Sequence, residues 1–286
     1  MTKTYPLADP IWCAGCGHFG VVSALDASLT RLNIPRHNAM VLAGIGCAGT
    51  IQNYVEAYGY HALHGRVLPT AAGAKISNPE LTVIAAGGDG DGLAIGGGHL
   101  LHTFRTNPSI VYLLMNNATY GLTKGQASPS SQGGFRGAEA DLQLDAIMLG
   151  LSLPGTTFLA RSYSGSADQL ERLTDAAINH ANAGRGFAFL EIISPCVAYN
   201  DRYEEWPSHL IDLDADDTYD PHDRANAFRT GLQLAQDDCV PTGMIFIDES
   251  DRGANGAESA AAPAQQNIDP AHNREAYAEA MRSFMS

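Results

Sequence analysis

Acidic residues set among glycines, followed by paired asparagines, are the clearest candidates for chemistry in this chain. An apolar segment runs into residues 87–92, where Asp89 and Asp91 alternate with glycines. A second apolar segment, residues 110–115, ends in two asparagines at 116–117. If these segments are parallel strands joined by a helix, the loops that follow them lie at one edge of the sheet. We therefore expect the carboxylates and the amides to lie close together.

Such a group of oxygens suits a hard divalent cation bound to a diphosphate. A carboxylate, an amide oxygen and a backbone carbonyl can hold the cation and leave positions open for phosphate oxygens. Glycines let backbone N–H groups approach a diphosphate at the start of a helix. EF-hand calcium loops also contain Asp-x-Asp-Gly, but they need glutamate at the position of Leu100. A turn without a ligand would leave the asparagine pair unexplained, so the pattern predicts a magnesium–diphosphate cofactor.

Four cysteines form a second candidate site. Cys13 and Cys16 are a CxxC pair, whereas Cys47 and Cys196 stand alone, and each segment lies at a turn beside an expected strand or helix end. Turns at one edge of a parallel sheet could bring four thiolates together, which suits either tetrahedral zinc or an iron–sulfur cluster. Structural zinc stays open at this point, although zinc sites usually combine two close pairs. The fifth cysteine, Cys239, fits a small buried hydrophobe.

Two other uses of the CxxC pair fit the sequence poorly. A thioredoxin-like redox pair should follow a strand and begin a helix, but only twelve residues precede this one, two of them proline. A c-type haem site needs histidine directly after the second cysteine, where Gly17 stands. Cysteine use in a chain without an evident export signal favours metal binding or catalysis over disulfides.

The order of expected elements predicts an α/β fold, a parallel sheet covered by helices on both faces. Apolar periodicity and turn residues place the elements. Strands are expected at 39–45, 81–86, 110–115, 156–161 and 186–193, and helices at 19–32, 94–104, 141–150 and 166–183, the last capped by Ser166.

The chain changes character after Cys196, and we expect three parts. Residues 1–200 should carry the cofactor and the cysteines. Residues 201–252 should form an extension that packs on this domain or on a partner, with an acidic arm at 201–223, a helix at 224–236 and an apolar run at 244–247. Residues 253–286 read as an Ala- and Gly-rich linker, 253–266, before a terminal helix at 275–284.

Composition excludes several classes of protein. A net charge of −14 without a cluster of Lys and Arg argues against nucleic-acid binding. No run of eighteen apolar residues could span a membrane, and the amino terminus lacks the apolar core of a secretory signal. We therefore expect a cytoplasmic protein that does not engage membranes.

Five motifs in one order resemble the β subunit of the two-subunit 2-oxoacid:ferredoxin oxidoreductases, over residues 10 to about 200. The motifs are WCAGCGH at 12–18, GIGCAG at 44–49, HGR at 64–66, GDGDG at 88–92 and NNATYGLTKGQ at 116–126. The resemblance implies the thiamine diphosphate-binding fold. It also implies that Asp89, Asn117 and the carbonyl of Thr119 bind Mg²⁺, and that Cys13, Cys16, Cys47 and Cys196 bind a [4Fe–4S] cluster.

The resemblance further implies which residues surround thiamine diphosphate and the substrate. The cofactor should meet Ile45, Gly46, Cys47, Ala48, His64, Gly65, Arg66, Val67, Gly88, Asp89, Gly90, Asp91, Asn117, Gly121 and Leu122. His64 and Lys124 are the candidate catalytic residues, His64 near the cofactor or the substrate carboxylate and Lys124 near a distal carboxylate. A lone histidine is more often structural, and an exposed loop lysine is usually only solvated.

The activity implied is oxidative decarboxylation of a 2-oxoacid to its acyl-CoA, with coenzyme A as co-substrate and ferredoxin as electron acceptor. Residues 120–126 look most like the 2-oxoglutarate branch, with pyruvate or a broad range of 2-oxoacids as the alternative. A non-redox thiamine enzyme would leave the cysteines without a task, and a zinc-stabilised binding module is the alternative from another class. No second α/β domain can supply the glutamate that activates the thiamine ring, so an α subunit is expected, as αβ or α₂β₂.

Overall fold

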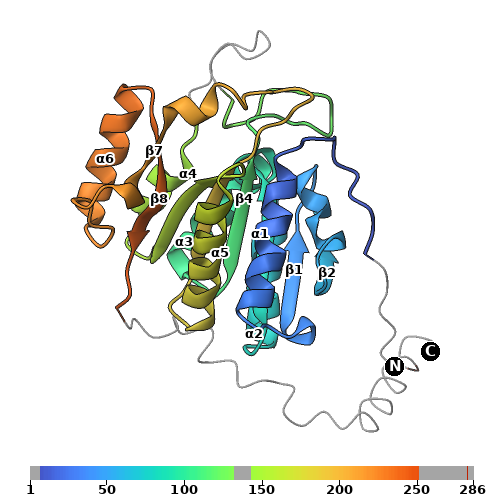
Figure 1. The fold of residues 1–286 in the computed structure, drawn as a ribbon. Helices are drawn as coiled ribbons and strands as arrows, with labels where there is room; N and C mark the ends of the chain where they lie inside the picture. Colours follow the sequence, from blue (N-terminus) through green and yellow to red (C-terminus); the bar gives the residue numbers. More distant parts are fainter. Residues whose placement is uncertain (1–6, 132–142, 251–281, 283–286) are drawn as a thin grey trace.

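One sheet forms the centre of the protein (Figure 1). The structure is a computed structural model that describes residues 7–131 and 143–250 together with Arg282. Within these residues eight strands lie in the order β2-β1-β3-β4-β6-β5-β8-β7. Their bounds are β1 Ala39–Ala43, β2 Tyr58–His61, β3 Thr82–Gly88, β4 Val111–Asn116, β5 Phe158–Tyr163, β6 Ala188–Ile193, β7 Leu210–Asp212 and β8 Val240–Ile247.

The sheet is parallel except where β8 runs antiparallel to β5. The residues of β5 and β6 are buried throughout, and those of β3 and β4 are buried up to the last residue of each strand. This burial explains why these segments are continuous apolar runs instead of alternating patterns. The expectation of a largely parallel α/β sheet is confirmed.

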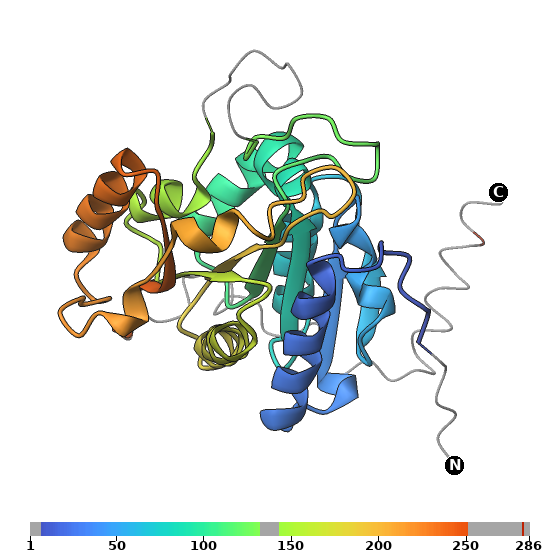
Figure 2. The ribbon, with the colours of Figure 1, turned by 45° about the horizontal axis from the view of Figure 1, so that its top comes forward.

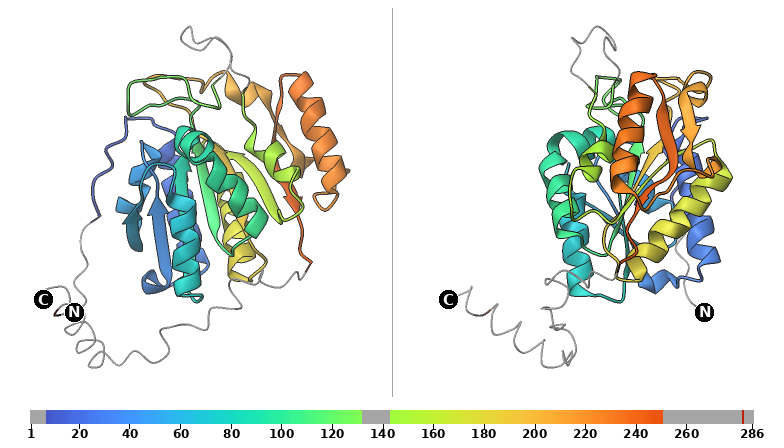
Figure 3. Two further views of the ribbon diagram at one scale, coloured as in Figure 1. Left: turned by 180° about the vertical axis from the view of Figure 1, so that it is seen from behind. Right: turned by 90° about the vertical axis from the view of Figure 1, so that its left-hand side faces the viewer.

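Helices cover both faces of the sheet (Figures 1 and 3). On one face α1 packs against α5, and on the other α2, α3, α4 and α6 follow one another. Each face has its own apolar core. The helices are α1 His18–Arg31, α2 Val67–Ser77, α3 Gly97–Thr106, α4 Ala146–Leu151, α5 Ala167–Asn182 and α6 Arg224–Gln236. None of the helices in the described ranges is long and apolar enough to cross a membrane.

Some elements differ from those expected. The strand β2 was missed because it is a fully exposed edge strand without a buried face. The helix α2 was missed because Pro69 and Gly73 interrupt its pattern, although proline is tolerated in a first turn. The helix α4 begins later than expected, after Asp145, whose carboxylate accepts from two backbone N–H groups. Ser166 does precede α5, but its side chain makes no capping hydrogen bond.

The segment after residue 200 joins the same sheet. Instead of a wholly extended arm, residues 201–223 include the short helix η5 (Trp206–His209), the strand β7 and the short helix η6 (Leu213–Ala215). The expected helix at 224–236 is confirmed as α6, and the apolar run at 244–247 is the end of β8. A domain boundary near residue 200 stays a prediction. The linker at 253–266 and the terminal helix at 275–284 lie outside the described residues.

The loops at the carboxyl ends of the strands gather along one edge of the sheet. Figure 2 brings this edge forward, and the loop after β4 (green) and the loop after β6 (yellow to orange) cross there. A hydrogen bond of 3.0 Å from Asn200 Nδ2 to the carbonyl of Asn117 joins these two loops. Ligand sites in open α/β sheets lie at this edge.

Candidate active site

Asp89 is buried directly after β3. The π-helix η3 (Gly90–Ile95) begins at the next residue, and such helices are rare and often found at functional sites. The carboxylate is 1% exposed, and its Oδ2 accepts a hydrogen bond from the Ser128 hydroxyl. Burial raises the pKa of Asp89 to about 6, against the lowering effect of the Ser128 hydrogen bond. A buried carboxylate whose charge has so little compensation is suited to a bound cation.

Asn117 lies beside this carboxylate because β3 and β4 are neighbours, with Gly88 opposite Met115. Asn117 and Thr119 are 7% and 3% exposed, and the Asn117 Oδ1 accepts from the Thr119 N–H at 3.1 Å. The Tyr120 hydroxyl donates to the Gly90 carbonyl at 3.3 Å. The loops after β3 and β4 therefore lie against each other at the sheet edge.

Asp91 joins its own loop to the segments of Ile45 and of His64 and Gly65 through hydrogen bonds. Its Oδ1 accepts from the Ile45 N–H at 3.0 Å, the Gly65 N–H at 2.8 Å and the His64 Nδ1 at 2.6 Å. With Nδ1 occupied by the contact with Asp91, Nε2 is the ring nitrogen left for another partner. A methyl group at Gly44 would collide with the Asp91 carboxylate, so this arrangement requires glycine there.

A cavity of about 110 Å³ opens between these loops. It is lined by His18, Ile45, Gly46, Cys47, Ala48, His64, Gly88, Asp89, Gly90, Asp91, Asn117, Thr119, Tyr120, Gly121, Leu122 and Thr123. The structure therefore brings together most of the residues that the sequence assigned to the cofactor. Their functional roles stay predictions.

Three of the residues assigned to the cofactor, Gly65, Arg66 and Val67, do not line this cavity, and neither does the candidate catalytic residue Lys124. The Gly65 N–H donates to the Asp91 carboxylate, and the Arg66 guanidinium donates to the carbonyls of Gly65 and Ile95. Val67 begins α2 and is 2% exposed in the apolar core. Lys124 is exposed on the loop after β4, in a left-handed backbone conformation with φ of 77°.

Hydrogen bonds hold the three cysteine segments together. The Trp12 indole donates to the Cys47 carbonyl at 2.8 Å, and the Gly17 N–H donates to the Pro195 carbonyl at 3.2 Å. These two hydrogen bonds connect the CxxC loop with the segments of Cys47 and Cys196. All five cysteines are free thiols, and Cys239, away from these segments, is half-buried instead of buried as expected.

The thiols of Cys16 and Cys47 lie close enough to the other cysteines of these segments to be affected by their charge. Burial raises the pKa of Cys16 and of Cys47 to about 11, and nearby thiolate charge adds to the effect: Cys13 and Cys196 act on both, and Cys16 acts on Cys47. Among the described residues, no three His, Cys, Asp or Glu side chains converge so as to hold a single metal ion. The cysteines of an iron–sulfur cluster bind different iron atoms and need no common centre.

Gly121 lies where the thiols meet the asparagine loop. A methyl group at this position would be 3.5 Å from Cys47 Sγ, 3.6 Å from Cys196 Sγ and 3.6 Å from Asn117 Nδ2. Both sulfurs are therefore within about 7 Å of the Asn117 amide nitrogen. The sulfurs of Cys47 and Cys196 and the cavity that holds Asp89 and Asn117 therefore share one rim of the sheet.

Two residues near the site were not singled out from the sequence. His18 lines the cavity, is 1% exposed, and lies 2.7 Å from the Ser194 hydroxyl through its Nδ1. Burial lowers the pKa of His18 to about 4, so the ring is neutral at pH 7. Ser128 belongs to no recognisable motif, and only folding brings it into direct contact with Asp89. The position of His18 just after the CxxC pair was the one available signal.

Comparisons with known proteins identify the family. The thiamine pyrophosphate enzyme C-terminal TPP binding domain matches residues 39–192. The chain is 34% identical to 2-oxoacid:ferredoxin oxidoreductase 2, subunit beta, of Aeropyrum pernix, over 92% of this chain and 88% of that protein. It is 36% identical to the 2-oxoglutarate synthase subunit KorB of Methanothermobacter thermautotrophicus, over 66% of each chain.

A solved structure agrees with this assignment. The 2-oxoglutarate:ferredoxin oxidoreductase from Magnetococcus marinus, with 2-oxoglutarate, coenzyme A and succinyl-CoA bound, superimposes with a TM-score of 0.81 at 30% identity. The match covers 89% of this chain and 87% of that one. The chain belongs to the β subunits of the 2-oxoacid:ferredoxin oxidoreductases, and its fold is that of their thiamine pyrophosphate-binding domain.

Proposed function

We propose that this β subunit, together with an α subunit, oxidatively decarboxylates a 2-oxoacid, 2-oxoglutarate in preference to others, to its acyl-CoA and CO₂. Electrons leave through a [4Fe–4S] cluster to ferredoxin. The observation that carries the proposal is the shared rim at Gly121, where two thiols and the Asn117 amide surround one point. This closeness is what a direct electron path between an organic cofactor and a cluster needs.

In this proposal Asp89, Asn117 and the Thr119 carbonyl hold Mg²⁺, and the glycines on either side of Asp89 receive the diphosphate. The buried Asp89 carboxylate and the oxygen-rich loop fit a hard cation that keeps positions open for phosphate. When bound, thiamine diphosphate supplies the electron sink for decarboxylation, and the cluster accepts single electrons. The protein positions the reacting groups, excludes water from them and provides the surrounding charges.

His64 is proposed to hold or move a proton at Nε2. The Asp91 carboxylate fixes the ring by accepting from Nδ1 at 2.6 Å, and the ring lines the cavity. A histidine held in this way by a carboxylate has a defined tautomer, and its other nitrogen faces its reaction partner as an acceptor. Because the side chain is 41% exposed, it stands where a substrate enters.

Lys124 is proposed to attract the distal carboxylate of a dicarboxylic 2-oxoacid. It lies outside the cavity on the loop whose Gly121, Leu122 and Thr123 line it, so its contribution is that of a charge near the entrance. The relatives named for 2-oxoglutarate support this branch, and the coenzyme A and succinyl-CoA bound to the Magnetococcus marinus enzyme support acyl-CoA as the product.

The four cysteines Cys13, Cys16, Cys47 and Cys196 are the proposed ligands of the cluster. Without iron, burial and mutual repulsion favour the protonated thiols of Cys16 and Cys47, and metal binding replaces those protons. The proposal includes an αβ or α₂β₂ assembly and a cytoplasmic location.

Turnover by the complex tests the proposal. The chain, co-expressed with its α subunit and purified anaerobically, should reduce ferredoxin when given a 2-oxoacid, coenzyme A, thiamine diphosphate and Mg²⁺. 2-Oxoglutarate should have a higher kcat/KM than pyruvate or branched 2-oxoacids, and Lys124→Met should lower the value for 2-oxoglutarate more than for pyruvate. If the dicarboxylate is the poorest substrate, the assignment to 2-oxoglutarate is wrong.

A further inference from the structure

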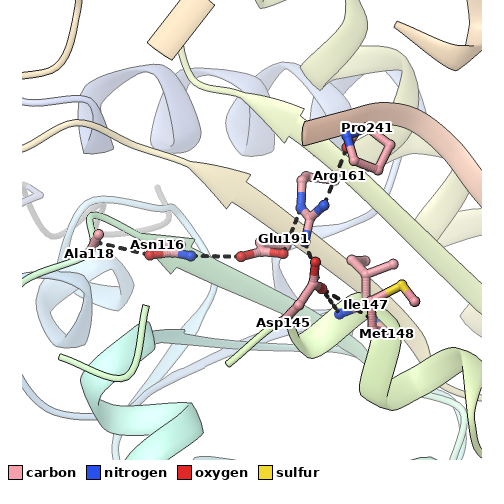
Figure 4. A network of polar contacts seen from close by, with 8 residues as sticks. All are labelled: Asn116, Ala118, Asp145, Ile147, Met148, Arg161, Glu191 and Pro241. Atoms are coloured by element: carbon pink, nitrogen blue, oxygen red, sulfur yellow. Dashed lines mark hydrogen bonds and ion pairs between the residues drawn. The ribbon is translucent and has the colours of Figure 1, made fainter. Parts of the chain in front are cut away.

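Two charged side chains are buried in the middle of the sheet, behind the asparagine loop. Arg161 on β5 and Glu191 on β6 are direct neighbours in register, and each is 4% exposed. Arg161 Nε donates to Glu191 Oε2 at 2.8 Å, and Arg161 Nη2 donates to Asp145 Oδ1 at 2.8 Å (Figure 4). Burying charges is costly, and apolar residues of similar size would often be no less stable. Their presence therefore calls for a role besides stability.

The free oxygen of Glu191 reaches the loop that carries the proposed cation ligands. Asn116 Nδ2 donates to Glu191 Oε1 at 2.7 Å, and Asn116 Oδ1 accepts from the Ala118 N–H at 3.0 Å (Figure 4). A continuous series of hydrogen bonds thus runs from Arg161 through Glu191 and Asn116 to the backbone of Ala118. Arg161, Glu191 and Asn116 all lie outside the lining of the cavity that holds Asp89 and Asn117.

The backbone at the end of this series is in an unfavourable conformation. Ala118 has φ of 52°, in the left-handed region that alanine rarely adopts because its Cβ crowds the backbone. Ala118 separates Asn117 from Thr119, so its conformation decides where both proposed ligands point. The Asn116 side chain accepts from the Ala118 N–H, and the Ser131 hydroxyl donates to the Ala118 carbonyl at 2.6 Å. An unfavourable conformation persists only where its surroundings fix it.

The hydrogen bonds have one possible direction. Arg161 can only donate, and the Ala118 N–H can only donate, so Asn116 must present its oxygen to Ala118 and its NH₂ group to Glu191. Glu191 must then accept from both sides, which requires two acceptor oxygens. A carboxylate supplies two, whereas the amide of glutamine supplies one acceptor and one donor.

We propose that Arg161, Glu191 and Asn116 are positioning residues that hold Ala118 in its left-handed conformation and thereby tune the affinity of the 117–119 segment for the divalent cation. This inference rests on the proposed function, because it takes Asn117 and the Thr119 carbonyl as cation ligands. None of the three positioning side chains touches the cation. They act through the backbone, as the outer partners of metal ligands do.

Mg²⁺ titration of the αβ complex, freed of Mg²⁺ but retaining its cluster, at a fixed concentration of thiamine diphosphate and followed by calorimetry, tests the inference. Glu191→Gln keeps the shape but places two donors against each other, so the Kd for Mg²⁺ should rise about 10- to 100-fold, the range typical of outer partners of metal ligands. Asn116→Ala should have a similar effect. In Asn116→Ala/Ala118→Gly, glycine adopts the left-handed conformation without the steric cost that alanine pays. Part of the lost affinity for Mg²⁺ should therefore return.

Glu249→Gln is the matched control. Glu249 pairs with Arg185 at 2.8 Å on the surface. It lies just after the end of β8 that pairs with the start of β5, at the opposite edge of the sheet from the site. This variant should leave the Mg²⁺ affinity unchanged. The melting temperature and the visible spectrum of the cluster confirm that each variant is folded.

The outcomes separate the inference from the proposed function. If Asp89→Ala weakens Mg²⁺ binding and Asn116→Ala does not, the positioning role is overturned while the cation site stands. If Asn116→Ala/Ala118→Gly is as weak as Asn116→Ala, the route through Ala118 is overturned. If Asp89→Ala itself binds Mg²⁺ normally, the proposed cation site fails, and the inference fails with it. Should Glu191→Gln not fold, the Asn116 and Ala118 variants carry the test alone.

Discussion

Ser128→Ala should make binding of the divalent cation strongly dependent on pH. The Ser128 hydroxyl donates to the Asp89 carboxylate, a residue that is 1% exposed. This hydrogen bond stabilises the ionised carboxylate, whereas burial favours the neutral acid, with the result that the pKa of Asp89 is about 6. Because Mg²⁺ binds the ionised form only, removal of the hydrogen bond weakens binding more and more as the pH falls toward and below the pKa of Asp89.

The size of the effect follows from the strength of such hydrogen bonds. A hydrogen bond to an ionised group contributes about 1.5–3 kcal/mol, so its loss should raise the pKa of Asp89 by about 1–2 pH units. The apparent Kd for Mg²⁺ is the intrinsic value multiplied by 1 + 10^(pKa − pH). Between pH 8 and pH 6 the apparent Kd should then increase about 2-fold in the wild type and about 10- to 50-fold in Ser128→Ala.

The assay is Mg²⁺ titration of the αβ complex at a fixed concentration of thiamine diphosphate, at pH 6, 7 and 8. Ser130→Ala is the matched control, because the neighbouring Ser130 hydroxyl is buried and has no hydrogen-bond partner among the described residues. The titration of the diphosphate itself is common to all three proteins and cancels in their comparison. The reasoning is refuted if Ser128→Ala and Ser130→Ala show the same pH dependence.

Three further predictions concern other parts of the chain. Burial, with a smaller contribution from nearby positive charge, lowers the pKa of His180 to about 4, so below pH 6.5 the unfolded chain takes up a proton that the folded one does not. Stability is thereby lost as the pH falls, and at pH 5 this costs about 2 kcal/mol. Relative to His180→Gln, the wild-type melting temperature should fall by about 4–8 °C more between pH 7 and pH 5, and an equal fall would contradict the shift. Cys196→Ser should disturb the visible spectrum of the cluster and leave cofactor binding intact, while Cys239→Ser changes neither; a normal spectrum would mean that the fourth ligand is another residue. A methyl group in Gly90→Ala would collide with the Tyr120 ring, which should cost about 1–3 kcal/mol of cofactor binding. Calorimetry should show that Gly90→Ala/Tyr120→Ala regains part of the lost free energy of cofactor binding, and no recovery would argue against the collision.

The sequence predicted the part of the site that is local in the chain. Asp89 and Asn117 follow two consecutive strands, and the geometry of a β-α-β unit brings such loops together without further information. The expected turns suggested that four cysteines could lie at one edge of the sheet, but only the resemblance to a family assigned them to one cluster, because the CxxC loop and the segment of Cys196 are joined by contacts between distant parts of the chain. Spacing alone left both zinc and an iron–sulfur cluster open, although the isolated positions of Cys47 and Cys196 are unusual for zinc.

Other contacts escaped sequence reasoning for different reasons. Ser128 reaches Asp89 from a loop 39 residues away, and a serine in a loop carries no signal of its partner. Arg161 and Glu191 did carry a signal, because each is a charged residue within an otherwise buried strand. Arg66 belongs to the HGR motif and Val67 directly follows it, yet Arg66 donates to the Ile95 carbonyl and Val67 packs in the core.

Substrate-dependent reduction of the cluster in the absence of ferredoxin tests the central claim most directly. The αβ complex, purified without oxygen, should contain about four iron atoms per β chain in its [4Fe–4S] cluster. Addition of 2-oxoglutarate in the presence of thiamine diphosphate and Mg²⁺ should bleach its visible absorbance, and Asp89→Ala should keep the iron but lose the bleaching. A colourless chain that holds one zinc, or a cluster that the substrate never reduces, would contradict the account.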